Sequence, residues 1–223
     1  MARPVALIFD LDGTLVDSAP DIHATSNLAL AAIGLPELPF ETVRGFIGGG
    51  VPHLIGALLS AVGEDPEGPK RRPMSRAFND AYAHAVDLTV LFPHVAEVLA
   101  ALHAQGHPMA ICTNKPVEPA RAVLDHFGLS ALFGAVVGGD SLPVRKPDPA
   151  PLVHALDALG GGPVLYVGDS ETDAATARAA RLPFALFTEG YRKTPVADLR
   201  PEVAFSDYRE LAGLVSALTP GGA

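Results

Sequence analysis

Two aspartates, Asp10 and Asp12, stand two positions apart directly after a short apolar run, Val5 to Phe9. Side chains two apart on a strand point to the same face, and Gly13 then permits a sharp turn. Two carboxylates held together repel each other unless a cation neutralises them or one of them is protonated. Such a pair suits Mg²⁺, which prefers hard oxygen ligands, or proton transfer by a shared carboxyl group. For an isolated pair, a plain turn that Asp12 begins and Asp10 caps is the commoner explanation.

A second acidic segment follows another apolar run, Val164 to Val167, and contains Asp169 and Asp173. Asp169 would lie at the end of a strand, with Asp173 one helical turn later. Capping of a helix by Asp169 or Ser170 explains this segment when it is taken alone. Capping explains less well why acidic residues follow two buried strands, because concentrated negative charge is costly unless a metal offsets it. The two segments together favour a metal site.

Two further segments carry groups that could hold an anion. Thr113 and Asn114 follow the run Met109 to Cys112, and their hydroxyl and backbone N–H groups could grip phosphoryl oxygens. A polar helix start explains that segment equally well on its own. Lys146 precedes Pro147, which biases the lysine toward an extended conformation and can fix the direction of its ammonium group. A random surface lysine is the commoner case, but the position before the next helix favours a charge-neutralising role.

Short apolar runs alternate with segments of helical spacing over most of the chain. The runs are Val5 to Phe9, Met109 to Cys112, Ala135 to Val137, Val164 to Val167 and Pro183 to Phe187. The helical segments are Val95 to Leu102, Pro119 to Phe127, Pro151 to Leu159, Thr172 to Ala180 and the closing Tyr208 to Leu218. Continuous apolar runs are typical of strands buried on both faces. The alternation therefore predicts an α/β fold with a doubly wound, Rossmann-like parallel sheet.

Residues 19–86 break the alternation, because they show helical patterns and no convincing buried strand. The candidate helices cover Ile22 to Ile33, Glu41 to Phe46, Val51 to Val62 and Arg71 to Val86. An insertion at this point would sit above the carboxyl ends of the strands, where open α/β sheets bind ligands. We therefore expect an α/β catalytic core, residues 1–17 and 88–223, and an inserted α-helical cap domain, residues 18–87, positioned as a lid.

The overall composition limits the classes of function. The formal net charge of −9 over 223 residues argues against nucleic acids and anionic membranes as partners, because both attract a basic face. No apolar stretch reaches the ~18 residues of a membrane span, no signal peptide is evident, and the single cysteine excludes an internal disulfide. We expect a cytoplasmic monomer or homodimer that binds a small molecule. If that molecule is an anion, metal or well-placed lysines must make its site locally positive.

The order of these segments resembles the haloacid dehalogenase superfamily. Phe9 to Ser18 is similar to its first motif, Thr113 to its second, Lys146 to its third, and Gly168-Asp169 with Asp173 to its fourth. The resemblance implies a core with an α-helical cap. True dehalogenases lack the second aspartate of the first motif, so Asp12 points to phosphoryl transfer. Within the superfamily the chain is most similar to phosphoglycolate phosphatases, in the segments Val43 to Gly50 and Gly190-Tyr191.

The resemblance implies a Mg²⁺-dependent phosphomonoesterase of a small anionic phosphate ester, with 2-phosphoglycolate as the expected substrate. In this mechanism Asp10 attacks phosphorus and becomes an aspartyl-phosphate. Asp12 protonates the leaving alkoxide and later deprotonates the attacking water. The Mg²⁺ ion would be held by Asp10, the backbone carbonyl of Asp12, and Asp169. Asp173 would bind a metal-bound water or orient Lys146.

The same resemblance assigns the anion-binding groups. Thr113 and the N–H of Asn114 would hold the phosphoryl group, and Lys146 would offset charge on Asp10 and on the transferring group. Phosphoryl transfer gains mostly from positioning and charge stabilisation, which these groups offer.

Substrate choice is expected to lie in the cap. Gly48, Gly49 and Gly50 precede a predicted helix whose free N–H groups could meet a substrate carboxylate. Arg44 or His53 could add positive charge there. Glycines in such a segment are more often plain loop formers.

Two alternatives stay open at this stage. One is a sugar-phosphate mutase, a pyrophosphatase or a nucleotidase on the same scaffold, and a mutase differs in releasing no free phosphate. The other is a catalytically silent binding module, because a fold alone does not establish an activity. That alternative predicts a lost nucleophile or metal carboxylate, and Asp10, Asp12 and Asp169 are all present.

Overall fold

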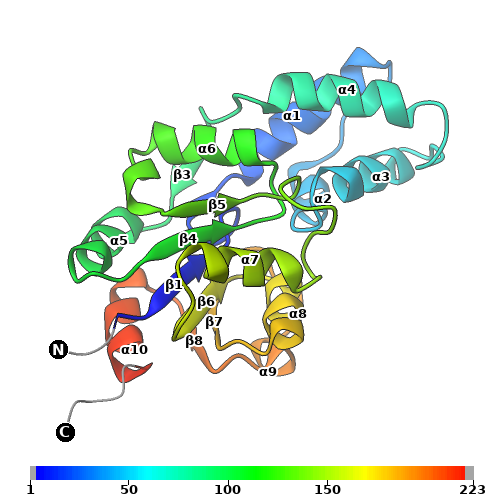
Figure 1. The fold of residues 1–223 in the computed structure, drawn as a ribbon. Helices are drawn as coiled ribbons and strands as arrows, with labels where there is room; N and C mark the ends of the chain where they lie inside the picture. The colour runs from blue at the N-terminus through cyan, green and yellow to red at the C-terminus, as the bar shows by residue number, and fades with distance from the viewer. Residues whose placement is uncertain (1–3, 219–223) are drawn as a thin grey trace, which may run out of the picture.

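A six-stranded sheet forms the centre of the molecule in the computed structural model, which describes residues 4–218 (Figure 1). Its strands are β1 (Ala6–Phe9), β4 (Met109–Cys112), β5 (Ala135–Val137), β6 (Val164–Gly168), β7 (Phe184–Phe187) and β8 (Val203–Phe205). They lie in the order β5-β4-β1-β6-β7-β8, and each neighbouring pair is parallel. The chain builds outward from β1 in both directions, so β1 marks the topological switch point at which such sheets bind ligands.

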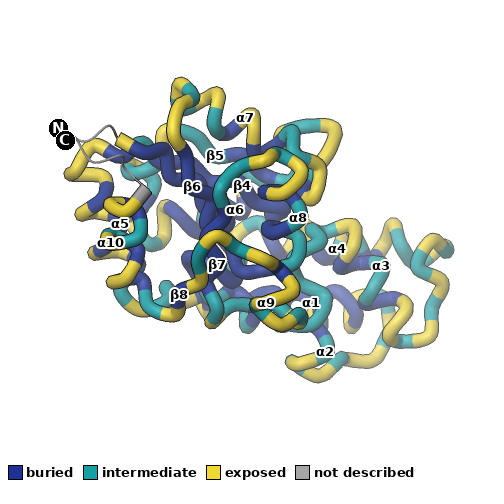
Figure 2. The backbone as a smooth tube through the Cα atoms, turned by 90° about the horizontal axis from the view of Figure 1, so that it is seen from below, coloured by how far each residue is buried: buried dark blue, intermediate teal, exposed yellow. Residues whose placement is uncertain are grey.

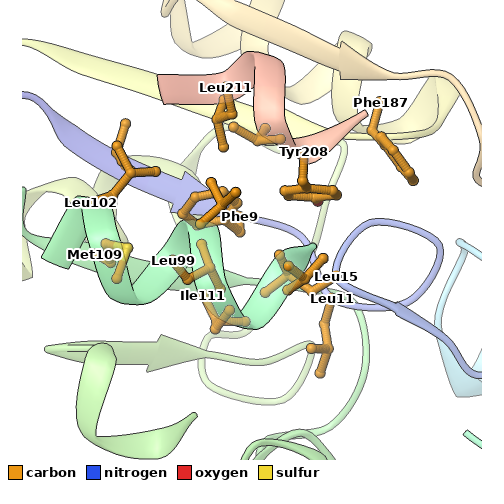
Figure 3. Packing of buried hydrophobic residues seen from close by; sticks show 14 of the residues in the cluster. Phe9, Leu11, Leu15, Leu99, Leu102, Met109, Ile111, Phe187, Tyr208 and Leu211 are labelled. Atoms are coloured by element: carbon orange, nitrogen blue, oxygen red, sulfur yellow. The ribbon is translucent and has the colours of Figure 1, made fainter. Parts of the chain in front are cut away.

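Side chains of β1 alternate between two apolar cores, one on each face of the sheet. Leu7 and Phe9 belong to the first core and Ala6 and Ile8 to the second. The first lies beneath α5 (Val95–Ala104), α6 (Val117–His126) and α10 (Leu211–Leu218), with 3₁₀ turns at Ser130–Leu132 and Tyr208–Glu210. The second lies beneath α7 (Ala150–Ala158), α8 (Glu171–Ala180) and α9 (Val196–Leu199). Figure 3 shows Phe9 within the first core, and Figure 2 shows burial running through the central strands.

The chain between β2 (Val16–Asp17) and β3 (Val90–Leu91) folds into helices at one end of the sheet (Figure 1). These helices are α1 (Ala19–Ala32), α2 (Phe40–Arg44), α3 (Val51–Ala61) and α4 (Arg71–Tyr82). They share an apolar core of their own, which includes Leu30, Ile55 and Phe78. The antiparallel pair β2–β3 holds together the two connections that lead to and from these helices. The cap is therefore a helical unit that is joined to the sheet by a two-stranded ribbon.

The fold class predicted from the sequence is confirmed, and the bounds of β4 and β5 coincide with the predicted apolar runs. Two elements of the second half, β8 and α9, were not predicted, and the last cap helix ends at Tyr82 rather than at Val86. β8 is a short apolar strand, Val203-Ala204-Phe205, that lies at the edge of the sheet with its middle residue exposed. The cap limits, residues 18–87, stay a prediction. Within residues 4–218, no helix is long and apolar enough to cross a membrane.

Candidate active site

The carboxyl ends of the central strands bring the predicted segments together. The Asp10 N–H donates to the Val167 carbonyl and the Thr113 N–H to the Val137 carbonyl, each at 2.9 Å, so the sheet continues up to the functional side chains. A cavity opens at this edge between sheet and cap. It is lined by Asp10, Asp12, Thr113, Asn114 and Lys115 from the core and by Ile22, Phe46, Ile47, Gly48, Gly50, Val51, Leu54 and Tyr82 from the cap.

Lys146 is buried at the centre of the acidic groups. Its Nζ lies 3.0 Å from Asp10 Oδ1 and 2.7 Å from Asp173 Oδ1, and it donates to the Tyr166 hydroxyl at 2.9 Å. Burial alone would lower the pKa of Lys146, but the Asp10 and Asp173 carboxylates outweigh it and raise that pKa. The ammonium therefore stays charged, and Asp173 holds it beside Asp10.

Three carboxylates could hold a metal ion. Asp10, Asp169 and Asp173 are buried, and each brings one oxygen within 4.8 Å of the others. Asp10 Oδ1 accepts no hydrogen bond, although it faces Lys146 Nζ. Lys146 pairs with two of these three buried carboxylates. The remaining excess of negative charge is one that a hard divalent cation would neutralise. The residues present therefore fit a divalent metal. Asp173 is one of the candidate direct ligands, in addition to its expected role of binding a metal-bound water or orienting Lys146.

The acidity of these groups reflects the same crowding. Burial raises the pKa of Asp10 to about 7, although the Lys146 ammonium pulls it down and the Asp173 and Asp12 carboxylates push it up. Burial, followed by the charges of Asp173 and Asp10, raises the pKa of Asp169 well above its usual range. Asp173 has the opposite balance: burial would raise its pKa, but the Lys146 ammonium and the hydrogen bonds from Ser170 and Tyr166 together lower it. Proton uptake by Asp10 and Asp169 thus partly relieves the repulsion when no metal is bound.

We expect Mg²⁺ to raise the melting temperature more at pH 8 than at pH 5. The pKa of Asp10 is about 7 in the folded protein, against an ordinary value of 3.8. Protonation of Asp10 therefore contributes its full stabilisation below about pH 4, and this stabilisation is lost as the pH rises through 7. The raised pKa of Asp169 makes its contribution to stability fall with rising pH in the same way, whereas the lowered pKa of Asp173 makes its contribution increase with pH. A bound cation removes this loss of stability. The rise in melting temperature caused by Mg²⁺ should therefore be larger at pH 8 than at pH 5 by about 3 °C or more. Thermal unfolding with Mg²⁺ or EDTA at both pH values measures the difference.

The control for this experiment is Asp10→Asn, which removes one titrating carboxylate. The variant should show a smaller difference between the two pH values than the wild type does. Equal Mg²⁺-induced shifts at pH 5 and pH 8 in the wild type would contradict the metal assignment.

Asp12 has a different environment from the acidic cluster. Its Oδ1 accepts hydrogen bonds from the Ser18 hydroxyl at 2.5 Å and from Lys115 Nζ at 3.1 Å. Lys115 also donates to the Tyr82 hydroxyl of α4 at 2.5 Å. No role was predicted for Lys115 or Tyr82 from the sequence, although Lys115 directly follows Asn114. The metal contact expected for Asp12 was through its backbone carbonyl, and it stays a prediction.

The residues that follow β4 connect the core with the cap. The Asn114 side chain donates from Nδ2 to the carbonyls of Gly48 and Lys146, each at 3.0 Å. The Thr113 hydroxyl lies at the cavity wall and accepts from the Lys115 N–H at 3.2 Å. Asn114 thus joins the cap loop at Gly48 to the segment that carries the predicted phosphoryl-binding groups, a contact that the sequence did not suggest.

The predicted cap residues divide into two groups. Gly48 and Gly50 line the cavity, and Gly50 precedes α3. Gly49 is not among the lining residues, and a Cβ there would lie 2.6 Å from the His53 ring. Arg44 is also absent from the lining. Its guanidinium donates to the Gly190 carbonyl at 3.3 Å and lies 5.5 Å from the centre of the Tyr191 ring. Arg44 therefore joins cap to core instead of facing the cavity.

Gly190 and Tyr191 link the acidic cluster to the start of the cap. The Tyr191 N–H donates to Asp169 Oδ2 at 2.6 Å, and its hydroxyl donates to Asp17 Oδ1 at 2.7 Å. A Cβ on Gly190 would lie 2.3 Å from the Gly13 carbonyl oxygen, so this close approach requires glycine. The segment singled out in the sequence thus positions a carboxylate and the first connection to the cap.

A parallel α/β core, an acidic cluster at its carboxyl edge and a helical cap define the class of protein. The family model of the haloacid dehalogenase-like hydrolases matches residues 5–181, so the chain belongs to that family. It is 52% identical over 210 residues to a phosphoglycolate phosphatase of Cereibacter sphaeroides, covering 94% of this chain and 96% of the relative. It is 48% identical to the phosphoglycolate phosphatase of Rhodobacter capsulatus, with 96% and 98% covered.

A solved structure shares the whole architecture. The crystal structure of a predicted phosphoglycolate phosphatase from Haemophilus somnus superposes with a TM-score of 0.89 at 32% identity. The match covers 96% of this chain and 99% of that one. The arrangement of core and cap is therefore shared between the two proteins.

Proposed function

We propose that the protein is a Mg²⁺-dependent phosphatase that hydrolyses 2-phosphoglycolate through an aspartyl-phosphate on Asp10. The observation that carries this proposal is the placement of the Asp10 carboxylate, between the Lys146 ammonium and a cavity beneath the cap. The Asp169 and Asp173 carboxylates complete a site that fits a divalent cation. The names of the relatives that match nearly the full chain support the substrate.

The first half-reaction uses side chains from four loops. Asp10 attacks phosphorus, so an Asp10–phosphorus bond forms while the bond to the ester oxygen breaks. Asp12 donates its proton to the leaving alkoxide, which departs as an alcohol. Lys146 offsets charge on Asp10 and on the transferring group, and the Thr113 hydroxyl holds one of its oxygens. A Mg²⁺ ion held by Asp10 and Asp169 would supply further neutralisation of phosphoryl charge.

The second half-reaction returns the enzyme to its starting state. The Asp12 carboxylate takes a proton from water, and the resulting hydroxide oxygen bonds to phosphorus while the Asp10–phosphorus bond breaks. Inorganic phosphate leaves, and Asp12 carries the proton for the next cycle. The apolar cap residues Ile22, Phe46 and Leu54 narrow the cavity, which limits access of bulk water during the first step.

We expect phosphate release from 2-phosphoglycolate to have the highest kcat/KM in a panel with glucose 1-phosphate, pyrophosphate and a nucleoside monophosphate. EDTA should reduce this activity to background, and added Mg²⁺ should restore it, because the acidic cluster needs a cation to accept a phosphate dianion. A colorimetric phosphate assay measures both effects. Preference for pyrophosphate or the nucleotide, or undiminished activity in EDTA, would count against the proposal. Isomerisation of the sugar phosphate without free phosphate would identify a mutase.

The remaining expectations concern the protein as a whole. A cytoplasmic location, a small-molecule partner and the choice between monomer and homodimer stay predictions. The division at residues 17/18 and 87/88 is likewise proposed, and the β2–β3 ribbon beside both positions supports it.

A further inference from the structure

We propose that Lys115 Nζ and the Tyr82 hydroxyl bind the carboxylate of the substrate and so select for a second anionic group. This inference rests on the proposed function and names the residues that give it its specificity. Lys115 comes from the core and Tyr82 from the last cap helix, and the two are in contact at 2.5 Å. A carboxylate bound by both would connect core and cap.

Lys115 is the cation that the cavity offers. Among the described residues that line this cavity, it is the only lysine or arginine. Arg44, the cationic candidate from the cap, is engaged with Gly190 and Tyr191 outside the lining. An anionic group beyond the phosphoryl position therefore meets the Lys115 ammonium before any other positive side chain of the wall.

The position of Lys115 matches the shape of the substrate. Asp12 protonates the ester oxygen in the proposed mechanism, and in 2-phosphoglycolate a single methylene separates this oxygen from the carboxylate. The Lys115 ammonium lies 3.1 Å from Asp12 Oδ1. Because Asp12 must lie beside the ester oxygen to protonate it, Lys115, which lies beside Asp12, is also close to the position of the substrate carboxylate.

The hydrogen-bond donors of Lys115 favour the same assignment. The Lys115 side chain is 1% exposed, and within residues 4–218 Asp12 is the only carboxylate paired with it. An ammonium group has three N–H donors, and among the described residues Lys115 Nζ donates to two acceptors, Asp12 Oδ1 and the Tyr82 hydroxyl. The third N–H is left for a substrate carboxylate. A neutral alkyl group at that position would offer it no acceptor.

Tyr82 supplies a second donor from the cap. Its hydroxyl oxygen accepts the hydrogen bond from Lys115, and its own hydrogen has no acceptor among the described residues. The Tyr82 side chain packs against Phe78 within the cap core, with ring centres 4.8 Å apart, so its direction is fixed by the cap. The free O–H is therefore available to a carboxylate only when α4 is in the position seen here.

The test compares 2-phosphoglycolate with ethyl phosphate, which has a methyl group in place of the carboxylate. The quantity measured is the ratio of the two kcat/KM values. Lys115→Met should lower this ratio by about 30-fold or more, and Tyr82→Phe by about fivefold. Lys70→Met, which removes a partly exposed ion pair of the cap, is the matched control and should leave the ratio unchanged. Circular dichroism checks that each variant is folded.

A binding experiment separates recognition from proton transfer. Calorimetry with Mg²⁺ would compare 3-phosphonopropionate, a non-hydrolysable isostere, with propylphosphonate, which lacks the carboxylate. Lys115→Met should weaken binding of the first ligand relative to the second. If Lys115 only positions Asp12, both substrates lose activity equally and the ratios stay constant, which overturns the inference. A wild type that releases no phosphate from 2-phosphoglycolate would overturn the proposed function itself, so the two failures are distinguishable.

Discussion

Replacing Asp10 with asparagine is expected to reduce kcat for phosphate release by roughly 10³-fold or more. The amide keeps the shape of the side chain but offers no carboxylate oxygen for attack on phosphorus. Mass spectrometry of acid-quenched reactions should show a phosphoryl adduct on the wild type and none on the variant. The measurement therefore tests the covalent step as well as the rate.

The loss should be chemical rather than structural. Burial raises the pKa of Asp10 to about 7, so its ionised form destabilises the metal-free protein at pH 8. Asp10→Asn should then be at least as stable as the wild type in EDTA at that pH. Asp157→Asn, an exposed aspartate on α7, is the matched control and should retain full activity. Steady turnover by Asp10→Asn at a rate near that of the wild type would contradict a mechanism in which Asp10 is the nucleophile.

The part of the site that the sequence could predict is the part that strand geometry controls. Asp10, Thr113 and Asp169 each follow a buried strand, and the carboxyl ends of parallel strands meet at one edge. Lys146 does not directly follow a strand. Its burial between Asp10 and Asp173 depends on the conformation of a loop, which hydrophobic periodicity cannot predict. Its charge-neutralising role was predicted from its position before the next helix, and the following proline indicated only that the direction of the ammonium is fixed.

The contacts between cap and core could not be predicted in the same way. Tyr82 lies 33 positions before Lys115, within a helix whose pattern indicates only an apolar face. Arg44 could equally have faced the cavity, and its stacking on Tyr191 depends on how two separate units meet. Periodicity gives the buried face of an element but not its partner across a domain boundary. The residues that choose the substrate are therefore the ones that require a structure.

Lys146→Met is expected to abolish phosphate release and to lower the free energy of unfolding by about 3–5 kcal/mol in EDTA. The substitution leaves the Asp10 and Asp173 carboxylates buried without the ammonium that now lies 3.0 Å and 2.7 Å from them. Urea unfolding measures the change. Lys70→Met is the matched control, because its partner Glu64 is also partly exposed and such a pair contributes about 1 kcal/mol or less. Equal losses in the two variants would contradict a stabilising role for the buried ammonium.

Adding Asp173→Asn to Lys146→Met separates the two roles of the lysine. The amide removes one of the uncompensated charges, so the double variant should regain part of the stability that Lys146→Met alone loses. Activity should not return, because Asp10 and the transferring phosphoryl group would still lack the Lys146 ammonium. Recovery of phosphate release together with stability would show that Lys146 acts only by keeping the protein folded. Recovery of stability alone, together with retained activity of the Asp173→Asn single variant, places its catalytic effect on Asp10, the one carboxylate of the pair that faces the cavity.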